Sequence, residues 1–332
     1  MAREPLLSLV LTLSLLAPSL AVPAAAEEPG YTNLQVLPKE ISRDELGGLM
    51  LANLSGLGLP RLAGEGCLYC HAGDLEVPRS DWDYASDAKP MKAKARVMMA
   101  MVREINARLA TLDERIDPAL EVTCATCHAG RADPRPLPDV LWNAYESGGI
   151  GTAEARYREL RERYFGSDAY DFRVHVLPRI ALRMADGGAI DDAIALAGLN
   201  AEINPEDAWA EQAWVALKLE KTIDAEGTEA ALAELDRLAP SLGPATLTPP
   251  LLDSLAWRLN RSERVKQGHA LIEANYERFP NEYRAIESLA FIRADTGRGE
   301  EAFALLERWL DANPDHARAR RLLVNLRSKA GD

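Results

Sequence analysis

The feature that most constrains this chain is the pattern C-x-x-C-H, which occurs twice, as CLYCH at residues 67–71 and CATCH at residues 124–128. The pattern is typical of covalently attached haem, in which both cysteines form thioether bonds and the histidine binds the iron. Two cysteines three residues apart on one helical turn can reach both vinyl groups at one porphyrin edge, which leaves the next residue beneath the iron. The sequence therefore predicts two c-type haems. Their predicted attachment and proximal residues are Cys67, Cys70 and His71 for the first haem, and Cys124, Cys127 and His128 for the second.

A single such motif can also be a zinc or thiol redox pair, but here the two motifs use all four cysteines of the chain. They also follow a predicted export signal. A basic residue, Arg3, precedes an apolar run over residues 6–22 and three alanines at 24–26. This order is typical of a secretory signal peptide, here cleaved near Ala26, with an uncleaved anchor as the alternative. Export to the periplasm fits the haem motifs, because bacteria form these thioether bonds outside the inner membrane.

The rest of the composition narrows the classes of partner. Beyond residue 26 no stretch approaches the ~20 apolar residues that span a bilayer, so we expect a soluble mature protein. The chain has 38 basic and 51 acidic residues and a net charge of −13. Such a charge disfavours nucleic acid and anionic membranes, and it favours a partner with a basic docking face.

A helix is predicted over residues 41–54, with Ser42 as its N-cap and Glu45 at the capping-box spacing. Its apolar stripe consists of Leu46, Leu49, Met50 and Leu54. A haem held by one histidine has a sixth iron position that a methionine sulfur can fill. Met50 is the only methionine between the signal and the first motif, so it is the candidate for this ligand. The alternative is that Met50 is an ordinary core residue.

A second helix is predicted over residues 91–112, opened by Pro90. Met98 lies in the middle of its apolar stripe and Met101 one turn further, so either can be the sixth ligand of the second haem. Cationic side chains border this helix and can pair with haem propionates, although a solvated face is the favoured interpretation for the lysines. These cations are Lys92, Lys94, Arg96 and Arg103.

Several segments beside the two motifs carry a family resemblance: LPKEI at 37–41, SRDEL at 42–46, ASD at 85–87, ARVMMAMVREIN at 95–106 and VTCATCHAG at 122–130. Over residues 34–138 the chain resembles the photosynthetic reaction-centre cytochrome c subunit family. In that family each unit is a helix with a methionine ligand, a turn and a second helix with C-x-x-C-H. The resemblance implies that His71 pairs with Met50 and His128 with Met98, with Met101 as the alternative to Met98. That family has four haem motifs where this chain has two, and the segment from Met50 to Cys67 is longer than its pattern.

From residue 140 onward the sequence shows helical periodicity and no strand pattern. Prolines follow apolar helical runs at 205, 240, 280 and 314, at steps of 35, 40 and 34 residues. Small residues, Ala193, Gly268 and Ala302, lie twelve positions before three of these prolines. A period near 34 with small residues at helix crossings resembles the tetratricopeptide family. We therefore predict a solenoid of three to five helical hairpins, in whose core the tryptophans lie.

The predicted fold is all-α, with a signal peptide (1–26), a dihaem cytochrome domain (27–139) and a tetratricopeptide-like domain (140–332). If a histidine and a methionine fill both irons, no site remains for substrate, so we expect a non-catalytic electron carrier rather than an enzyme. The expected partners are redox proteins or a membrane-bound respiratory or photosynthetic complex, docked through the helical repeats. The alternatives are a dihaem peroxidase-like enzyme with one open haem, and a haem-bearing scaffold. His175 is the first replacement to consider if a methionine ligand fails.

Overall fold

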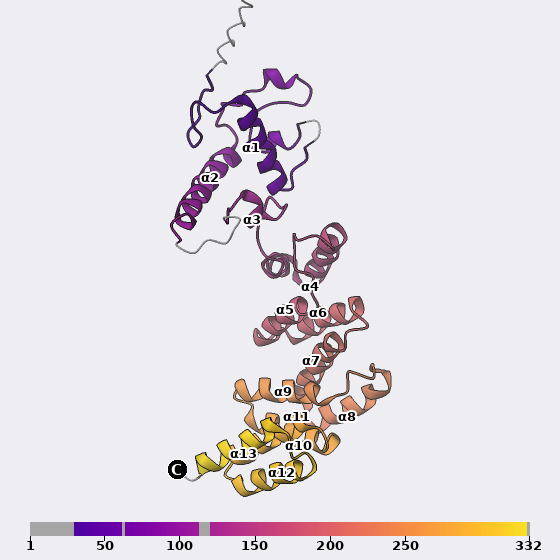
Figure 1. Cartoon of the computed structure of the whole chain (residues 1–332). Helices are drawn as coiled ribbons and strands as arrows, with labels where there is room; N and C mark the ends of the chain where they lie inside the picture. The colour runs from indigo at the N-terminus through magenta and orange to yellow at the C-terminus, as the bar shows by residue number, and fades with distance from the viewer. Residues whose placement is uncertain (1–29, 62–63, 113–119, 331–332) are drawn as a thin grey trace, which may run out of the picture. The chain divides into compact units, whose positions relative to one another are not determined.

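The structure, a computed structural model, describes residues 30–61, 64–112 and 120–330 (Figure 1). These residues form thirteen α-helices and three short 3-10 helices, with no strand among them. The predicted all-α class is confirmed. The chain divides into two compact units between Ala132 and Asp133. The predicted signal peptide, residues 1–26, lies outside the described residues, and the predicted domain limits at 27–139 and 140–332 stay predictions.

The N-terminal unit contains few helices. They are α1 (Arg43–Gly56), η1 (Cys67–Tyr69), η2 (Arg79–Asp81), α2 (Pro90–Leu109) and α3 (Cys124–His128). The predicted cap of α1 is confirmed: Glu45 N donates to Ser42 Oγ (3.3 Å) and Ser42 N donates to Glu45 Oε2 (3.0 Å). Pro90 opens α2 as predicted, and α2 ends at Leu109. Both helices predicted in this half are therefore present, shifted by one to three residues at their ends.

The apolar core of this unit is thin. Among the described residues from 30 to 132, only Leu54 and Trp82 are buried apolar side chains. The Trp82 indole N–H donates to Asp74 O (2.7 Å), and its ring lies against Gly73, where an added Cβ would come within 2.5 Å of it. A unit of this size needs far more buried apolar area to be stable by itself. Something other than its own side chains must therefore supply much of the burial.

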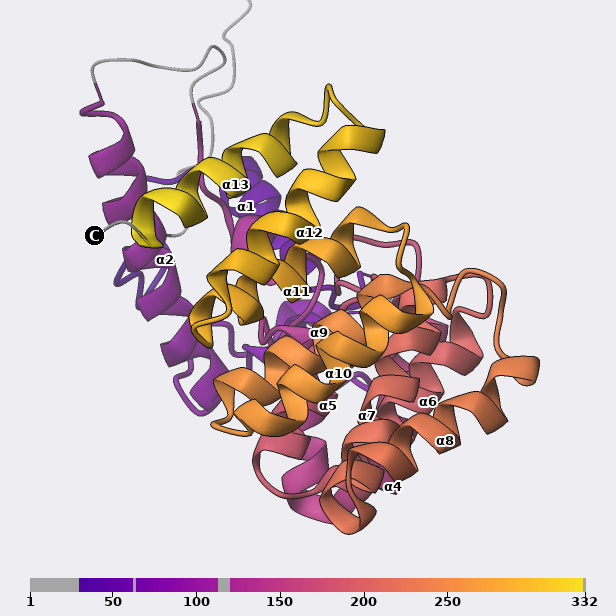
Figure 2. The same ribbon diagram turned by 90° about the horizontal axis from the view of Figure 1, so that it is seen from below.

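The C-terminal unit is built from longer helices. They are α4 (Leu137–Tyr164), α5 (Val176–Asp186), α6 (Ile190–Ile203), α7 (Ala208–Glu226), α8 (Thr228–Leu238), η3 (Ala239–Ser241), α9 (Pro249–Arg261), α10 (Val265–Arg278), α11 (Tyr283–Asp295), α12 (Gly299–Ala312) and α13 (Ala317–Ala330). Consecutive helices pack in pairs, α5 with α6, α7 with α8, α9 with α10 and α11 with α12, and α13 packs on α12 (Figures 1 and 2). These four hairpins fall within the predicted three to five. No helix among the described residues is both long enough and apolar enough to cross a membrane.

The sequence signals of the repeats have physical counterparts. The second helix of each hairpin ends two residues before a predicted proline, at 203, 238, 278 and 312. Ala193 and Ala302 are fully buried, and a Cβ added at Gly268 would lie 2.7 Å from Ala256 O on the preceding helix. Small residues are therefore required where the paired helices approach each other.

The same side-chain bond recurs in two hairpins. Asn200 of α6 donates to Val174 O (3.0 Å), and Asn275 of α10 donates to Pro249 O (3.1 Å). Each asparagine thereby satisfies a carbonyl at the start of its partner helix.

The prediction that the tryptophans lie in the core of the repeats is wrong for one of them. Trp209 is 45% exposed and lies outside the core. The other tryptophans of this unit are partly buried against the core: Trp142, Trp214, Trp257 and Trp309.

The helix α4 is not continuous. Gly148 and Gly149 have non-helical backbone angles, and the φ of +75° at Gly149 belongs to the region that favours glycine. Side chains from both halves of α4, including Leu141 and Tyr157, share a core with α5 and α6. This helix therefore folds back as an irregular element ahead of the four hairpins.

Candidate haem-binding sites

The first motif forms a tight turn that gathers its three functional residues. Cys67 opens η1, Cys70 N donates to Cys67 O (3.2 Å), and His71 N donates to the same oxygen (2.9 Å). Both cysteines are free thiols of intermediate burial. Burial raises the pKa of the Cys70 thiol, and Cys67 adds to this effect. The two thiols and the imidazole therefore come from a single turn, as attachment to one porphyrin edge requires.

The His71 ring is oriented by a backbone carbonyl. Its Nδ1 lies 3.2 Å from Tyr84 O, and the two aromatic rings meet edge to face with centroids 5.2 Å apart. When Nδ1 donates to a carbonyl, the lone pair of Nε2 remains for a metal. Burial lowers the pKa of His71; the bond to Tyr84 O opposes this shift, and Lys92 and Arg96 add to it. The lowered pKa favours the neutral imidazole, the form that binds iron.

The second motif has the same arrangement on a different local fold. Thr123 and Thr126 form the capping box of α3, a five-residue helix that holds the whole motif. Ala129 and Gly130 have positive φ angles, so the chain reverses immediately after His128. His128 Nδ1 consequently lies 2.8 Å from Arg131 O. Both histidines thus have Nδ1 on a nearby carbonyl and Nε2 available.

The end of α1 contacts both motif segments. The Cys124 thiol donates to Asn53 Oδ1 (3.2 Å), and a Cβ added at Gly56 would lie 2.9 Å from Ala125 N. On the other motif, Leu54 Cδ2 lies 3.0 Å from the position of a Cβ at Gly66, the residue before Cys67. From the sequence we predicted only that a helix ends near residue 54. The role of this helix end in joining the two motifs depends on close backbone approach, which the sequence does not show.

The candidate methionine ligands lie on α1 and α2. Met50 is partly buried on α1, one turn before Asn53. Met98 and Met101 are 45% and 43% exposed on α2, beside Val97 at 66%. Met98, which we placed in the middle of the apolar stripe of this helix, is exposed. The pairing of Met50 with His71, and of Met98 or Met101 with His128, stays a prediction.

The cations of α2 have partners within the protein. Lys92 is only 9% exposed, and its Nζ donates to the carbonyls of Tyr84, Ala85 and Ser86 at 2.8–2.9 Å. The interpretation of this lysine as part of a solvated face is therefore wrong. Arg96 forms an ion pair with Asp87 (2.8 Å). Hydrogen bonds from Asn33, followed by Arg96, lower the pKa of Asp87 despite its partial desolvation.

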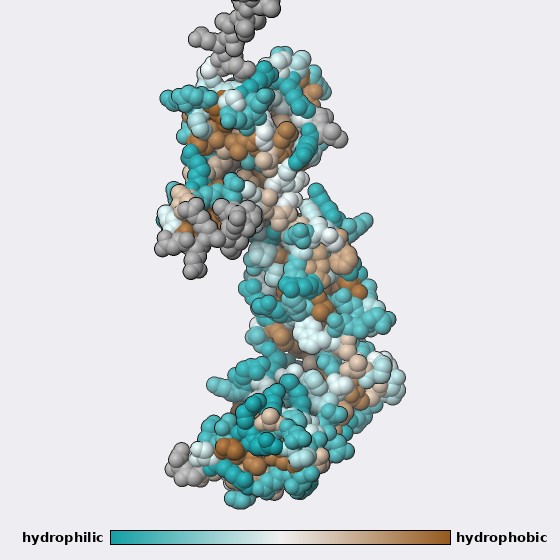
Figure 3. Space-filling view, in the orientation of Figure 1, coloured by the Kyte–Doolittle hydropathy of each residue, from teal (hydrophilic) through white to brown (hydrophobic). Residues whose placement is uncertain are grey.

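Residues of the N-terminal unit fit c-type haem. The four thiols are free, the two imidazoles present Nε2, and apolar side chains of α2 are exposed in a unit with little apolar core. Apolar surface is visible on this unit in Figure 3. Two porphyrins would cover such side chains and supply the missing burial.

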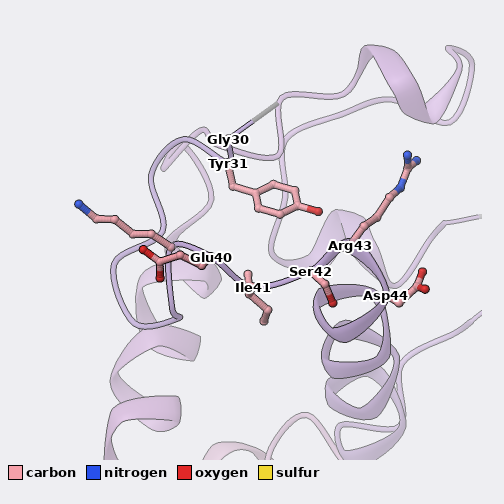
Figure 4. A pocket seen from close by; sticks show the side chains of 8 residues that line it. Gly30, Tyr31, Glu40, Ile41, Ser42, Arg43 and Asp44 are labelled. Atoms are coloured by element: carbon pink, nitrogen blue, oxygen red, sulfur yellow. The ribbon is translucent and has the colours of Figure 1, made fainter. Parts of the chain in front are cut away.

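An open hollow beside the start of α1 is separate from both motifs. It is lined by residues 30–31 and 39–44, which are mostly polar (Figure 4). None of these residues carries a thiol or an imidazole. The hollow therefore contributes nothing to haem attachment.

Comparison with known proteins agrees with the geometry of the motifs. Residues 16–165 match the family of the photosynthetic reaction centre cytochrome C subunit, a span that extends beyond residues 34–138 on both sides and reaches the end of α4. No curated protein matches the chain. The crystal structure of MamA matches at 17% identity, over 54% of this chain and 98% of that chain, with a TM-score of 0.26. The repeats are therefore described from the helix pairs of this structure and not from that similarity. Over residues 16–165, somewhat less than half of the chain, the protein is thus similar to the photosynthetic reaction centre cytochrome c subunit family, and this match supports a c-type cytochrome with covalently bound haem.

Proposed function

We propose that the protein is a periplasmic dihaem electron carrier whose helical repeats dock a redox partner. The observation that carries this proposal is the matched pair of histidines, His71 and His128. Each follows two free thiols on one turn, and each has Nδ1 on a backbone carbonyl. Such a bond fixes the ring and increases the basicity of Nε2. Two equivalent arrangements support two haems rather than one.

Each group of residues has a defined task in this proposal. Cys67 and Cys70 hold the first haem and Cys124 and Cys127 the second, as thioethers. Met50 would be the second iron ligand beside His71, and Met98 the second ligand beside His128, with Met101 as the alternative to Met98. When bound, each haem supplies a one-electron iron couple. Because both irons are closed, the residues serve electron transfer and offer no site to a substrate.

Contacts around α1 support exchange between the two sites. Leu54 lies against Gly66 beside the first motif, and Asn53 lies against Cys124 in the second. The two attachment turns are therefore held in one small unit by one helix end. Outer-sphere electron transfer between two haems requires that they lie a short distance apart.

The partner and the compartment follow from other features. The predicted signal peptide directs the chain to the periplasm, where c-type attachment takes place. The repeats of the C-terminal unit provide a docking surface, as helical solenoids commonly do. The net charge of −13 favours a partner with a basic face, a redox protein or a membrane-bound respiratory or photosynthetic complex.

The first test is the optical spectrum of the full-length holoprotein, oxidised and reduced, with its mass to count the haems. The far-red band of the oxidised protein reports sulfur bound to iron. We expect two haems, loss of about half of this band in Met50→Ala, and a similar loss in either Met98→Ala or Met101→Ala. Met99→Ala is the control, since Met99 points away from the other two on the same helix.

Carbon monoxide separates the proposal from an enzyme. If both irons are closed, carbon monoxide leaves the spectrum of the reduced wild type unchanged. A wild type with one methionine-bound haem and one that binds carbon monoxide or peroxide contradicts the carrier and supports a peroxidase-like enzyme. A mass that corresponds to one haem contradicts the dihaem proposal directly.

A further inference from the structure

One backbone carbonyl in the first site has two partners. Tyr84 O lies 3.2 Å from His71 Nδ1 and accepts a hydrogen bond from Lys92 Nζ at 2.9 Å. The same ammonium donates to Ala85 O and Ser86 O, each at 2.8 Å. Lys92 is 9% exposed, so its charge acts where water screens it poorly. The orienting carbonyl of the candidate iron ligand is therefore held by a buried cation.

A shared carbonyl is a weaker acceptor for the histidine. The ammonium draws electron density from Tyr84 O, which leaves less for the bond from Nδ1. The distances agree: Nδ1 to carbonyl oxygen is 3.2 Å at His71 and 2.8 Å at His128, whose acceptor is Arg131 O. A strong bond at Nδ1 makes the imidazole a better donor and favours oxidised iron. The longer bond at His71 favours reduced iron.

The charge of Lys92 acts in the same direction. A nearby cation disfavours the additional positive charge of oxidised iron. Arg96 supplies a second cation, and Asp87 compensates in part, at 3.4 Å from Lys92 Nζ and 2.8 Å from Arg96. Asp87 is about half exposed, so solvent weakens its compensation, whereas Lys92 is buried.

We propose that Lys92 raises the reduction potential of the haem attached at Cys67 and Cys70, through the Tyr84 carbonyl that it shares with His71. Lys92 is thereby a positioning residue for the proximal histidine. This inference rests on the proposed function, because it takes His71 as a ligand of one of two haems. It predicts that a charge on α2 affects one haem and leaves the other unchanged.

The test is a redox titration of the full-length holoprotein, followed optically and fitted with two one-electron steps. Lys92→Gln removes the charge and keeps two N–H donors for the carbonyls. We expect the equilibrium constant for reduction to fall about tenfold in one step, a shift of about 59 mV for a one-electron couple, and to stay constant in the other. Lys92→Arg keeps the charge and should stay near wild type. Lys94→Gln, at an exposed position two residues further, is the matched control.

The responding step is assigned with the methionine variants. The step that moves in Met98→Ala or Met101→Ala belongs to the second haem, and Lys92→Gln must move the other one. The inference is overturned if Lys92→Gln leaves both steps unchanged, if it moves the second haem, or if Lys94→Gln has the same effect. If the protein carries two haems whose potentials do not change in Lys92→Gln, the inference alone is wrong. If the protein carries one haem, the proposed function is wrong.

If Lys92→Gln loses haem, the inference can be tested with a variant that is expected to shift the reduction equilibrium in the opposite direction. Asp87→Asn removes the carboxylate beside Lys92 Nζ and leaves the cation less compensated. The same step should then rise in its reduction equilibrium constant. A fall in that constant, or no change in it, overturns the inference without any variant at position 92.

Discussion

Gly58 and Gly130 hold the end of α1 against the second haem motif through backbone contact. Gly58 has a φ of +63°, and a Cβ placed there would lie 1.9 Å from Gly130 O and 2.6 Å from Gly130 C. Gly130 N donates to Gly56 O (3.0 Å), so the segment after α1 and the segment after α3 lie side by side. Backbone atoms cannot rotate away as the end of a side chain can. These glycines are therefore needed for the packing of α1 on α3.

Gly58→Ala should destabilise the haem unit by roughly 2–3 kcal/mol, since it combines overpacking against backbone with a side chain at positive φ. Gly48→Ala is the matched control, because a Cβ on this glycine of α1 has nothing within 4 Å. The control should be neutral or stabilise by up to about 1 kcal/mol. Urea unfolding monitored by haem absorbance measures the stability of both variants. Equal midpoints for Gly58→Ala and wild type would show that the contact with Gly130 carries no stability.

The sequence predicts only part of the site at this scale. The cysteines and histidines are predictable because the chemistry of attachment demands those side chains at that spacing. The carbonyls of Tyr84 and Arg131 are not, because every residue has a carbonyl and only the fold selects one. The burial of Lys92 is missed for a related reason: lysine is usually exposed, and the three carbonyls that hold it are invisible in the sequence.

At the scale of elements, the repeats were predictable because each rests on a local signal. Proline cannot continue a helix, so its position gives the end of each second helix. Ten residues, 239–248, separate α8 from α9, where four residues separate α6 from α7. These six extra residues explain the proline step of 40 in a series near 34. The fold of α4 was not predictable in the same way, because its break depends on two glycines, Gly148 and Gly149, within an otherwise helical pattern.

Gly268→Ala should destabilise the repeat unit by about 1–3 kcal/mol. An added Cβ would lie 2.0 Å from Asn260 Oδ1 and 2.7 Å from Ala256 O, so α10 would have to move away from α9. Gly299→Ala in α12 is the matched control, where the nearest atom, in Phe303, lies 3.7 Å away. Thermal unfolding followed by far-UV circular dichroism compares the two. A melting temperature of Gly268→Ala equal to that of the control would refute the close crossing of α9 and α10.

At the scale of the whole molecule, the two units differ in what makes them stable. The C-terminal unit has two apolar clusters, one formed by α4 to α7 and one by α7 to α13. The described part of the N-terminal unit buries only Leu54 and Trp82 among its apolar side chains. Burial of apolar area is the main favourable term in folding, so the first unit must gain it from the haems and the second need not.

Replacing all four cysteines by alanine should therefore separate the two units. The variant attaches no haem, so we expect residues up to about 132 to unfold while the repeat unit keeps its helices. Limited proteolysis should leave a resistant fragment that begins near Asp133, and circular dichroism should retain the signal of α4 to α13. The matched control is the holoprotein, in which the N-terminal unit should resist the same protease. A resistant N-terminal unit in the cysteine-free variant would mean that its own side chains suffice, against the thin core that the structure shows.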